Sequence, residues 1–488
     1  MIINRKQMLE IEKNSGLSYA EIMSLVAEKL VQFIKERFPE MQSILVLAGN
    51  GNNGGDALVT AKILSAEYNV SVYLINGQPK TPVAKQVITE LSKDVFIKEY
   101  ELKDIAEKAD VIIDGVFGFS YHGNLDEHIA GIFQKLNSYR NKTVSIDINS
   151  GCECDSGYCD ADALLSRYTC AIQYRKPFHA LKKEHQMFEE CITLDLGLPY
   201  DEPSVYQEMN EEIFFSHFPR KKENDYKGTN GKTLLIGGSY GMAGALSMNI
   251  TGAKTIGSSY LEAGVSDSIY QIVAGKFMTP VFHPFSSDNY ESTLSKVIAQ
   301  ASAIGYGSGC TNLEKKTEIM DMVLLNAHCP VVLDAEALRQ LVNNTYLLCF
   351  VHVPVILTPH IGEFSALLNK PKEYVQEHRE ECATMFSQKF HVYVVLKGAN
   401  TIVVSPDGRK YINESGCPSL AQAGSGDLLT GMIAASLAIQ KDIFTAVTMA
   451  VWLHGYLSEY GLKYHSMQNF PLSCYPSLMD EIYRSHGY

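Results

Sequence analysis

The residues 424–427, Gly-Ser-Gly-Asp, open a segment in which apolar residues recur at helical spacing. A glycine-rich turn at the start of a helix presents backbone N–H groups at the positive end of the helix dipole, which suits a phosphate or a developing oxyanion. Asp427 repels a phosphate unless it takes a proton or holds a metal, so we interpret it as a general base. Taken alone, an Asp in a first helical turn more often only complements the dipole.

Two upstream segments strengthen the functional interpretation of Asp427. An apolar segment at 392–396 runs into Lys-Gly-Ala-Asn-Thr at 397–401, and another at 355–357 runs into a polar turn at 358–363. The order strand, polar turn, strand, polar turn, helix is typical of an open α/β sheet that binds its ligand at the strand ends.

A second loop of unusual composition follows the apolar segment 43–48. Residues 49–56, Gly-Asn-Gly-Asn-Asn-Gly-Gly-Asp, contain four glycines and three asparagines in eight positions. Such a loop is entropically costly to order, so it favours close backbone approach to a ligand over a plain connection. The Asn-Asn-Gly-Gly-Asp core is a far more specific signal than a lone glycine-rich turn.

Carboxylates also end two apolar segments of the first half. Asp114 lies within 111–119 and Asp147 within 143–151, both predicted as buried parallel strands. Carboxylates at parallel strand ends meet where ligands bind, so together with Asn53 they could hold a cation, or one of them could move protons. The alternative is that each Asp caps the structure that follows.

Composition narrows the class of protein. The 488 residues are 46% hydrophobic and 20% charged, which is typical of a protein of two or three domains with a buried core. The net charge of −13 argues against nucleic acid or an anionic membrane as partner. No signal sequence or membrane-length apolar run is found, so we expect a cytoplasmic protein. Eleven scattered cysteines, including Cys152, Cys154 and Cys159, favour reduced thiols over disulfides or a metal site.

Alternating strand and helix patterns predict an α/β protein of two domains without internal repeats. A stretch rich in proline and charge separates them, so we predict domains at 1–210 and 226–488 with a linker at 211–225. A second loop of small residues, 237–245, follows a strand at 233–236, but it lacks the spacing of a P-loop.

With these motifs in order, the chain resembles the bifunctional NAD(P)H-hydrate repair enzymes, in which a YjeF-type epimerase domain is fused to a dehydratase domain. The resemblance covers nearly the whole length and rests on 52–56, 111–118, 147–151, 333–338, 358–364, 396–398 and 423–431. It implies an N-terminal Rossmann-like three-layer α/β/α sandwich and a C-terminal ribokinase-like α/β/α domain. It also implies repair of R and S hydrates of NADH and NADPH, which dehydrogenases cannot use.

For the first domain, the resemblance implies epimerisation of the hydroxyl-bearing carbon, with Asp147 as acid/base and Lys176 assisting it. A potassium ion would be held by Asn53, Asp114 and Ser150. The implied substrate-binding residues are Asn52, Asn53, Gly54, Gly55, Asp56, Gly118, Phe119, Ser120, Tyr121, His122, Gly123, Asn124 and Asp147.

For the second domain, the resemblance implies phosphorylation of the S-hydrate hydroxyl and elimination of phosphate. Asp427 would deprotonate the hydroxyl, while the amides of 424–426 stabilise the transferring phosphoryl group. The donor would be ADP or ATP with Mg²⁺; we expect ADP, which fused prokaryotic members generally use. The implied hydrate-binding residues are Ala263, Gly307, His360 and Asp427, and the nucleotide-binding residues are Lys397, Gly398, Ala399, Asn400, Thr401 and Gly426. We also expect a homo-oligomer.

The first domain departs from the family pattern at several positions. Asn149 replaces the usual Pro, Ala57 replaces a Gly, and residues 22–27 replace a Leu-Met-Glu-Asn-Ala-Gly-like stretch. The loop 117–123 is also bulkier than usual. The proposed acid and cation ligands all remain, so we expect an active epimerase. The alternatives are a ribokinase-like kinase of a small alcohol with a non-catalytic dinucleotide-binding N-terminal domain, and a nucleotide sensor without turnover.

Overall fold

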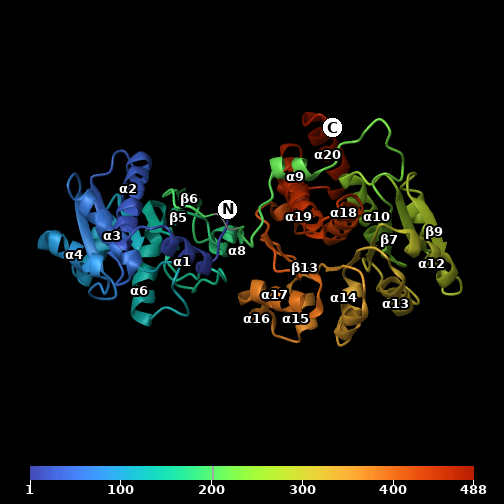
Figure 1. The fold of residues 1–488 in the computed structure, drawn as a ribbon, viewed down its shortest axis with the longest axis horizontal. Coiled ribbons are helices and arrows are strands. Elements are labelled where there is room, and N and C mark those ends of the chain that lie inside the picture. Colours follow the sequence, from blue (N-terminus) through green and yellow to red (C-terminus); the bar gives the residue numbers. More distant parts are fainter. Residues whose placement is uncertain (201–202) are drawn as a thin grey trace. The chain divides into compact units, whose positions relative to one another are not determined.

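The computed structural model describes residues 1–200 and 203–488, and the chain divides into one unit up to Tyr206 and another from Gln207 (Figure 1). The strands of the first unit are β1 (Ser43–Ala48), β2 (Asn69–Leu74), β3 (Val111–Gly115), β4 (Thr143–Ile146), β5 (Tyr168–Ile172) and β6 (Glu190–Leu194). Its helices are α1 (Arg5–Asn14), α2 (Tyr19–Arg37), α3 (Asn52–Leu64), α4 (Pro82–Glu90), α5 (Glu99–Lys108), α6 (Glu127–Leu136), α7 (Pro177–Ala180) and α8 (Lys182–His185), with 3₁₀ turns η1 (Lys93–Val95) and η2 (Asn137–Lys142).

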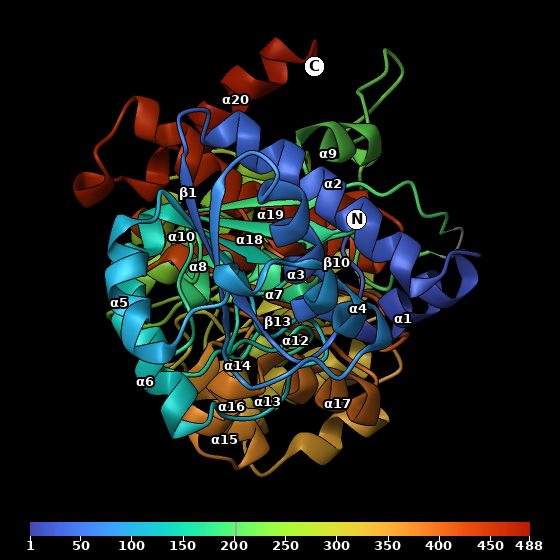
Figure 2. The same ribbon diagram turned by 90° about the vertical axis from the view of Figure 1, so that its left-hand side faces the viewer.

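The first sheet is parallel throughout and has the order β2-β1-β3-β4-β5-β6. Successive side chains of β1 belong to two different hydrophobic cores. Those of Ile44, Val46 and Ala48 pack with helices α1 to α4, whereas those of Leu45 and Leu47 pack with α5 and α6. This period of two is the geometry of a strand buried on both faces. Figure 2 shows the two groups of helices on opposite sides of the sheet.

The second unit holds the larger sheet. Its strands are β7 (Thr233–Gly237), β8 (Leu261–Ser266), β9 (Val281–Phe285), β10 (Ala303–Tyr306), β11 (Val331–Leu333), β12 (Val355–Leu357), β13 (Tyr393–Leu396), β14 (Ile402–Val404) and β15 (Lys410–Ile412). Its helices are α9 (Glu211–His217), α10 (Ala243–Ile256), α11 (Tyr270–Ala274), α12 (Tyr290–Gln300), α13 (Lys316–Asn326), α14 (Glu336–Leu341), α15 (Ile361–Leu368), α16 (Lys372–Glu377), α17 (Arg379–Phe390), α18 (Ser425–Ile439), α19 (Ile443–Tyr460) and α20 (Tyr475–Ser485). Short 3₁₀ turns are η3 (Thr345–Phe350), η4 (Pro418–Leu420), η5 (Gly461–Lys463), η6 (Met467–Asn469) and η7 (Leu472–Cys474).

The second sheet has the order β15-β14-β13-β12-β11-β10-β7-β8-β9, and only the pairs β13–β14 and β14–β15 are antiparallel. Helices α10, α18, α19 and α20 share one hydrophobic core on one face, and α14, α15 and α17 lie on the other side in Figure 1. Helices therefore cover both faces, and the predicted α/β class with two units is confirmed.

Each sheet reverses its strand order at one point. In the first sheet, β1 lies between β2 on one side and β3 on the other. In the second sheet, β7 lies between β8 and β10. Ligands of open α/β sheets bind outside the carboxyl ends of the strands at such a switch point. The Asn-rich loop follows β1, and the loop of small residues at 237–245 follows β7, so each loop lies at this position.

The segment 211–225, expected to be a linker, begins with helix α9. Phe214 of this helix is fully buried in the core of the second unit, with its ring 5.4 Å from that of Trp452. The first part of this segment is thus an integral element of the second unit. Within the described residues, none of the helices has the length and apolarity that crossing a bilayer requires.

Candidate active sites

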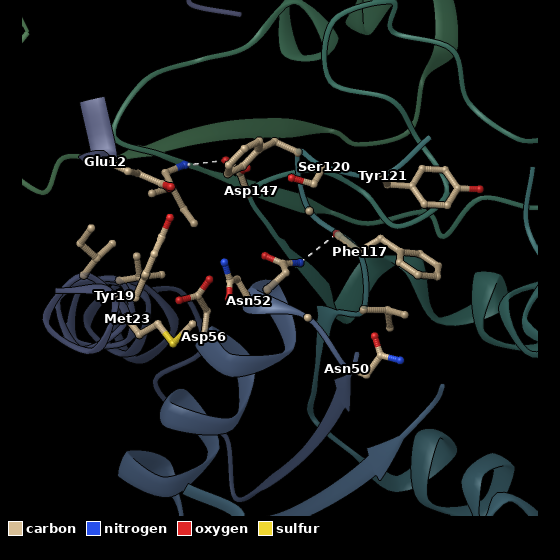
Figure 3. Close-up of a pocket in the computed structure, with 18 residues that line it drawn as sticks. Glu12, Tyr19, Met23, Asn50, Asn52, Asp56, Phe117, Ser120, Tyr121 and Asp147 are labelled. Carbon is tan, nitrogen blue, oxygen red and sulfur yellow. Dashed lines mark hydrogen bonds between the residues drawn. The ribbon is translucent and has the colours of Figure 1, made fainter. Parts of the chain in front are cut away.

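A pocket of about 280 Å³ lies at the switch point of the first sheet (Figure 3). It is formed by the start of α3, the loop after β3, the end of β4 and residues of α1 and α2. The lining residues are Glu12, Tyr19, Ile22, Met23, Val26, Asn50, Gly51, Asn52, Asn53, Asp56, Val116, Phe117, Gly118, Phe119, Ser120, Tyr121, Asp147 and Ile172. The pocket thus combines apolar walls with amides and carboxylates, as small-molecule sites do.

Asp147 is held in a rare backbone conformation directly after β4. Its φ is +62°, which a non-glycine residue adopts at an energetic cost and which often marks a functional position. His179 stabilises the conformation, because its Nε2 donates to the Asp147 carbonyl at 2.7 Å while its Nδ1 accepts from the Lys176 N–H at 2.9 Å. These two bonds require the neutral ring, and burial followed by the charge of Lys176 lowers the pKa of His179 well below its usual value.

The carboxylate of Asp147 has one occupied oxygen and one without a partner. Oδ1 accepts from the buried ammonium of Lys176 and from the Ile172 N–H, the latter at 3.1 Å. Oδ2 is buried and has no hydrogen-bond partner in the described part of the chain. A buried acceptor without a partner costs free energy unless a ligand uses it, so Oδ2 is the atom available to a bound substrate.

Two further carboxylates line the same pocket. Burial first, then the charge of Asp147, raises the pKa of Glu12 to about 7, although Lys176 opposes the shift. Burial first, then Asp147 and Glu12, raises the pKa of Asp56 well above its ordinary value. The pocket therefore holds carboxyl groups with different proton affinities, which is the arrangement that separates acid from base.

The predicted cation ligands Asn53, Asp114 and Ser150 lie together behind the pocket. Asp114 is fully buried and accepts from Ser150 Oγ at 2.5 Å and from the Ser150 N–H at 3.0 Å. Ser150 Oγ also lies 3.5 Å from the Phe117 carbonyl, to which Asn53 Nδ2 donates at 2.8 Å. Within residues 1–200, no basic side chain pairs with Asp114, and burial raises its pKa. A buried carboxylate beside neutral oxygen donors fits a cation.

Some of the predicted substrate-binding residues of the first unit line the pocket, and others lie outside it. Asn52, Asn53, Asp56, Gly118, Phe119, Ser120, Tyr121 and Asp147 line the pocket. Gly54 and Gly55 lie inside α3, where a Cβ on Gly54 would stand 1.9 Å from the Gly49 carbonyl oxygen. His122, Gly123 and Asn124 lie outside the lining, and they contact Arg5, Glu153 and Tyr158 instead.

In the second unit, Asp427 lies in the first turn of α18. This helix begins directly after Gly424, whose φ of +93° favours glycine. Asn249 Nδ2 donates to the Asp427 carbonyl at 2.7 Å and so fixes the start of α18 against α10. Burial first, then the charge of Asp334, raises the pKa of Asp427 to about 6, with Lys397 opposing. A carboxyl group with this pKa is ionised at neutral pH yet basic enough to take a proton.

Asp334, whose side chain is 2% exposed, and Lys397, whose side chain is 20% exposed, form an ion pair at the carboxyl ends of their strands. Lys397 Nζ donates to Asp334 Oδ1 at 2.9 Å, and Thr358 Oγ1 donates to the same oxygen at 2.7 Å. Ser308 Oγ donates to Asp334 Oδ2 at 3.1 Å. A Cβ on Gly426 would lie 3.3 Å from Lys397 Nζ, so the lysine reaches the glycine turn of α18. The lysine and the turn thus form one anion-binding corner.

The predicted nucleotide residues 397–401 form a tight turn between β13 and β14. Thr401 Oγ1 donates to the Gly398 carbonyl at 3.2 Å, and Asn400 Nδ2 donates to the Asn413 carbonyl at 2.9 Å. Buried Arg379 donates to the Asn400 carbonyl at 2.8 Å, and a Cβ on Gly398 would lie 2.6 Å from its Nη2. Hydrogen bonds within the turn and to Arg379 and Asn413 outside it hold the turn in place.

The remaining predicted hydrate-binding residues do not form one cluster. Gly307 follows β10 with a φ of +117°, and a Cβ there would lie 2.1 Å from the Asp334 carbonyl oxygen. His360 caps α15, where its Nδ1 accepts from the Gly362 N–H at 3.0 Å, and its side chain is 59% exposed. Ala263, in contrast, lies inside β8 and is fully buried in the hydrophobic core.

The sequence interpretation did not single out several residues of these sites. In the first unit they are Glu12 and Tyr19, and in the second they are Asn249 and Ser308. Glu12 carries a signal that could have found it, because it continues the buried stripe of Met8 and Ile11 at helical spacing.

The cysteine prediction is wrong for one pair. Cys152 and Cys159 are joined by a disulfide, whereas nine other cysteines are free, among them buried Cys154. Their strand-like pairing across a short loop brings the two residues together, with 4.0 Å between their Cα atoms. Spacing along the chain does not reveal such a pairing. No cluster of three or more His, Cys, Asp or Glu residues suited to a metal occurs in the described residues.

Comparison with known proteins agrees with this geometry. Residues 19–178 match the family model described as YjeF-related protein N-terminus, and residues 233–475 match the model described as NAD(P)H-hydrate dehydratase. The bifunctional NAD(P)H-hydrate repair enzyme Nnr of Moorella thermoacetica is 28% identical over 463 residues, covering 89% of this chain and 86% of the relative.

Solved structures match the second unit. The ADP/ATP-dependent NAD(P)H-hydrate dehydratase of Bacillus subtilis, co-crystallised with ATP and Mg²⁺, is 31% identical with a TM-score of 0.50, and the match covers 57% of this chain and 97% of that one. A ribokinase-like superfamily protein of Enterococcus faecalis V583 is 20% identical with a TM-score of 0.53, covering 59% and 99%, which confirms the ribokinase-like fold. With its two matched regions in this order, the chain belongs to the family of bifunctional NAD(P)H-hydrate repair enzymes.

Proposed function

We propose that this chain restores hydrated NADH and NADPH to the usable reduced cofactors. The first unit interconverts the R and S hydrates, and the second dehydrates the S form after phosphorylating its hydroxyl from ADP or ATP. The observation that carries the proposal is the occurrence, in one chain, of two switch-point sites that each hold a carboxylate: Asp147, which is buried, and Asp427, which is partly buried. A lone kinase would need only the second.

In the second unit, Asp427 takes the proton of the substrate hydroxyl as the oxygen attacks the terminal phosphoryl group. The backbone amides of 424–426 and the ammonium of Lys397 stabilise the charge on the transferring group. Phosphorylation turns a poor leaving group into a good one, and loss of phosphate then restores the ring double bond. Mg²⁺ would enter as the complex of the nucleotide, as in the crystals of the Bacillus subtilis relative.

The nucleotide would lie against the turn 397–401, whose hydrogen bonds hold it in place and so support recognition at low entropic cost. Gly426 lies near Nζ of Lys397, and the backbone of His360 forms a parallel β-bridge with that of Lys397. We favour ADP over ATP as the donor, as the resemblance to this family implies; the relative from Bacillus subtilis is described as ADP/ATP-dependent. Gly307 and Asp427 would contact the hydrate. The burial of Ala263 in the core leaves it an indirect role at most.

In the first unit, the Asn-rich start of α3 and the loop 118–121 would hold the dinucleotide, and Oδ2 of Asp147 would act on the hydroxyl. The buried ammonium of Lys176 contacts Oδ1 of Asp147 and would hold the carboxylate in place. A potassium ion held by Asn53, Asp114 and Ser150, with the Phe117 carbonyl, would offset the buried charge of Asp114 and fix the loop after β3.

We propose that the epimerase comprises residues up to Tyr206 and the dehydratase residues from Gln207, including α9. The division of the chain into two compact units at this point supports the proposal. A cytoplasmic location and a homo-oligomeric assembly stay predictions, which fractionation and light scattering would check.

One experiment tests the whole proposal. Mixed R and S hydrates of NADH are incubated with the chain and ADP, then with ATP, while the absorbance of the reduced nicotinamide is followed. We expect full recovery of NADH with ADP. Recovery that stops once the S form is consumed would remove the epimerase from the proposal. No recovery with either nucleotide would contradict repair and favour the small-alcohol kinase.

A further inference from the structure

Inversion of a nicotinamide hydrate needs two proton transfers. Hydration of the enamine in reduced nicotinamide places the hydroxyl on the carbon bonded to the ring nitrogen. That centre inverts when the hydroxyl takes a proton and leaves as water while the nitrogen lone pair forms a C=N bond. Water then adds to the other face of the ring and loses a proton. One group must give a proton and another must take one.

We propose that Glu12 is the second proton-transfer group of the first unit, working as the partner of Asp147. This inference rests on the proposed epimerase function. Glu12 lines the pocket from α1, whereas Asp147 lines it from the end of β4, so the two carboxyl groups approach a ligand from different elements. In Figure 3, Glu12 and Tyr19 extend toward one another, while Asp147 and Asp56 face the same pocket.

The position of Glu12 is fixed by its helix. Helix α1 packs into the core through Met8 and Ile11, and the side chain of Glu12 continues this buried stripe. No ion pair of Glu12 occurs within the described chain; its charge environment consists of Asp147, Asp56 and Lys176. An acidic side chain that is partly buried without a basic partner has no evident role in stability.

The N-terminal segment connects α1 directly to the catalytic loop. Ile2 bridges to Arg175, the Ile3 N–H donates to the Arg175 carbonyl at 2.9 Å, and Lys176 follows at once. At the other side of the helix start, the Arg5 N–H donates to Asp155 Oδ1 at 2.8 Å. The helix that carries Glu12 and the loop that carries Lys176 are therefore anchored to each other.

The two carboxyl groups are suited to opposite roles. Asp147 forms an ion pair with the buried ammonium of Lys176, whereas burial, followed by the charge of Asp147, raises the pKa of Glu12 to about 7. Protonated Glu12 gives its proton to the leaving hydroxyl, and the Asp147 carboxylate takes one from the incoming water. In the reverse direction the roles exchange, so the proton count balances.

Several groups face Glu12. The charge of Asp147 raises its pKa and that of Lys176 lowers it, Asp56 lines the same pocket, and the hydroxyl of Tyr19 lies beside Glu12 in Figure 3. Above a pH of about 7, Glu12 loses its proton. Epimerisation should therefore slow as the pH rises through 7, because no donor remains.

The test compares Glu12→Gln and Glu12→Asp in the full chain. R hydrate is supplied, the R and S forms are separated chromatographically, and rates are measured across pH against buffer alone. We expect Glu12→Gln to lower kcat about 10²-fold with little change in KM and to abolish the decline above pH 7. Glu12→Asp should recover part of the rate and keep the decline. Glu10→Gln is the matched control, because Glu10 lies on the same helix and forms an ion pair with exposed Lys6.

Dehydration of S hydrate with ADP reports the second unit, and thermal unfolding reports whether the first unit folds. A decline near pH 7 that persists in Glu12→Gln would overturn the role of Glu12 and point to Asp56 as the donor. Glu12→Asp no faster than Glu12→Gln would also overturn it. If wild-type chain dehydrates S hydrate but never interconverts the epimers, the epimerase function fails together with this inference. Full epimerase activity of Glu12→Gln would overturn the inference alone.

Discussion

Lys397 reaches past β12 to Asp334, and its Nζ donates to Oδ1 of that carboxylate at 2.9 Å. The two residues end strands β13 and β11, and Thr358, at the end of the strand between them, donates to the same oxygen. Three adjacent strand ends are thereby joined beneath the glycine turn of α18. The same contact orients the ammonium toward Gly426, while Asp427 has a hydrogen bond from the Ser308 side chain.

Breaking this ion pair should destabilise the second unit. Lys397→Met leaves a buried, uncompensated carboxylate, and we expect a loss of about 3–5 kcal/mol in the free energy of unfolding. Asp334→Asn with Lys397→Met should lose less than Lys397→Met alone. Chemical unfolding of the second unit measures the differences, and Lys410→Met is a control that removes a lysine paired with Glu380 outside this site. If Lys397→Met and the double variant were equally stable, the two residues would not be energetically coupled.

The pH dependence of that coupling has a defined sign. Burial alone would raise the pKa of Asp334, but the charge of Lys397 and the hydrogen bonds from hydroxyl groups outweigh it and lower this pKa from 3.8. Burial likewise opposes the charge on Lys397, but Asp334 outweighs it and raises the pKa of Lys397 from 10.5. The stabilisation is therefore present between these values, lost as the pH falls through the lowered pKa of Asp334, and lost as it rises through the raised pKa of Lys397. Unfolding midpoints of wild type and Lys397→Met should converge at the acidic extreme.

Asp427 should act as a base whose protonation turns off dehydration. Its pKa is raised to about 6, so dehydration of S hydrate should fall as the pH drops below about 6 and level off above it. Asp427→Asn should lower kcat about 10²–10⁴-fold with little change in the binding of ADP. Epimerisation by the same variant is the internal control, because the first unit is a separate body. A variant that dehydrates at the wild-type rate would exclude the role of base.

Most of the strand pattern could be predicted from the sequence, because runs of apolar, β-branched residues are strong signals of buried parallel strands. Strands β1 and β7 lie where the apolar runs predicted them, whereas β3 and β4 begin as predicted but end at Gly115 and Ile146, short of the predicted ends at 119 and 151. Strands β8, β9 and β15 were not predicted. Gly264 interrupts β8 and Pro284 interrupts β9, and both residues weaken a strand signal that neighbouring strands override in the folded sheet.

The sequence predicted the loops that carry the catalytic carboxylates, but not the residues that reach the sites from other elements. Asp147 and Asp427 follow recognisable strand and turn patterns, whereas Glu12 enters its pocket from a helix far away in sequence. Asn149, where the family usually has Pro, is explained by the fold: its Nδ2 donates to the Leu164 carbonyl at 2.8 Å and to Ser166 Oγ at 3.0 Å. These bonds tie the loop of Asp147 and Ser150 to the approach of β5. Contacts of this kind have no signature in one sequence.

Potassium should stabilise the first unit, and Asp114 should be required for the effect. Asp114 is fully buried among Ser150, Ser145 and Val116 donors, so a bound cation would offset its desolvation. Exchanging K⁺ for tetramethylammonium should lower the melting temperature of the wild-type first unit but not that of Asp114→Asn. Calorimetry measures both. If the melting temperature of the wild type did not change when K⁺ is exchanged, the proposal of a potassium site would be contradicted.

The close crossing of α10 and α18 should be sensitive to a single methyl group. A Cβ on Gly252 would lie 2.0 Å from the Leu428 carbonyl oxygen, and one on Gly431 would lie 1.9 Å from that of Asn249. Because the obstacles are backbone atoms, Gly252→Ala must push the helices apart, at a cost of about 1–3 kcal/mol in stability.

The displaced element is the first turn of α18, which carries Asp427, so dehydration should also slow, by about 10²-fold for a shift near 1 Å. Gly244→Ala is the matched control on the same helix, since a Cβ there meets no atom within 4 Å. It should leave stability unchanged or raise it slightly, because alanine favours the helix. Unfolding curves and the rate of S-hydrate dehydration measure both variants. If Gly252→Ala matched Gly244→Ala in stability and rate, the helix crossing would not be what positions Asp427.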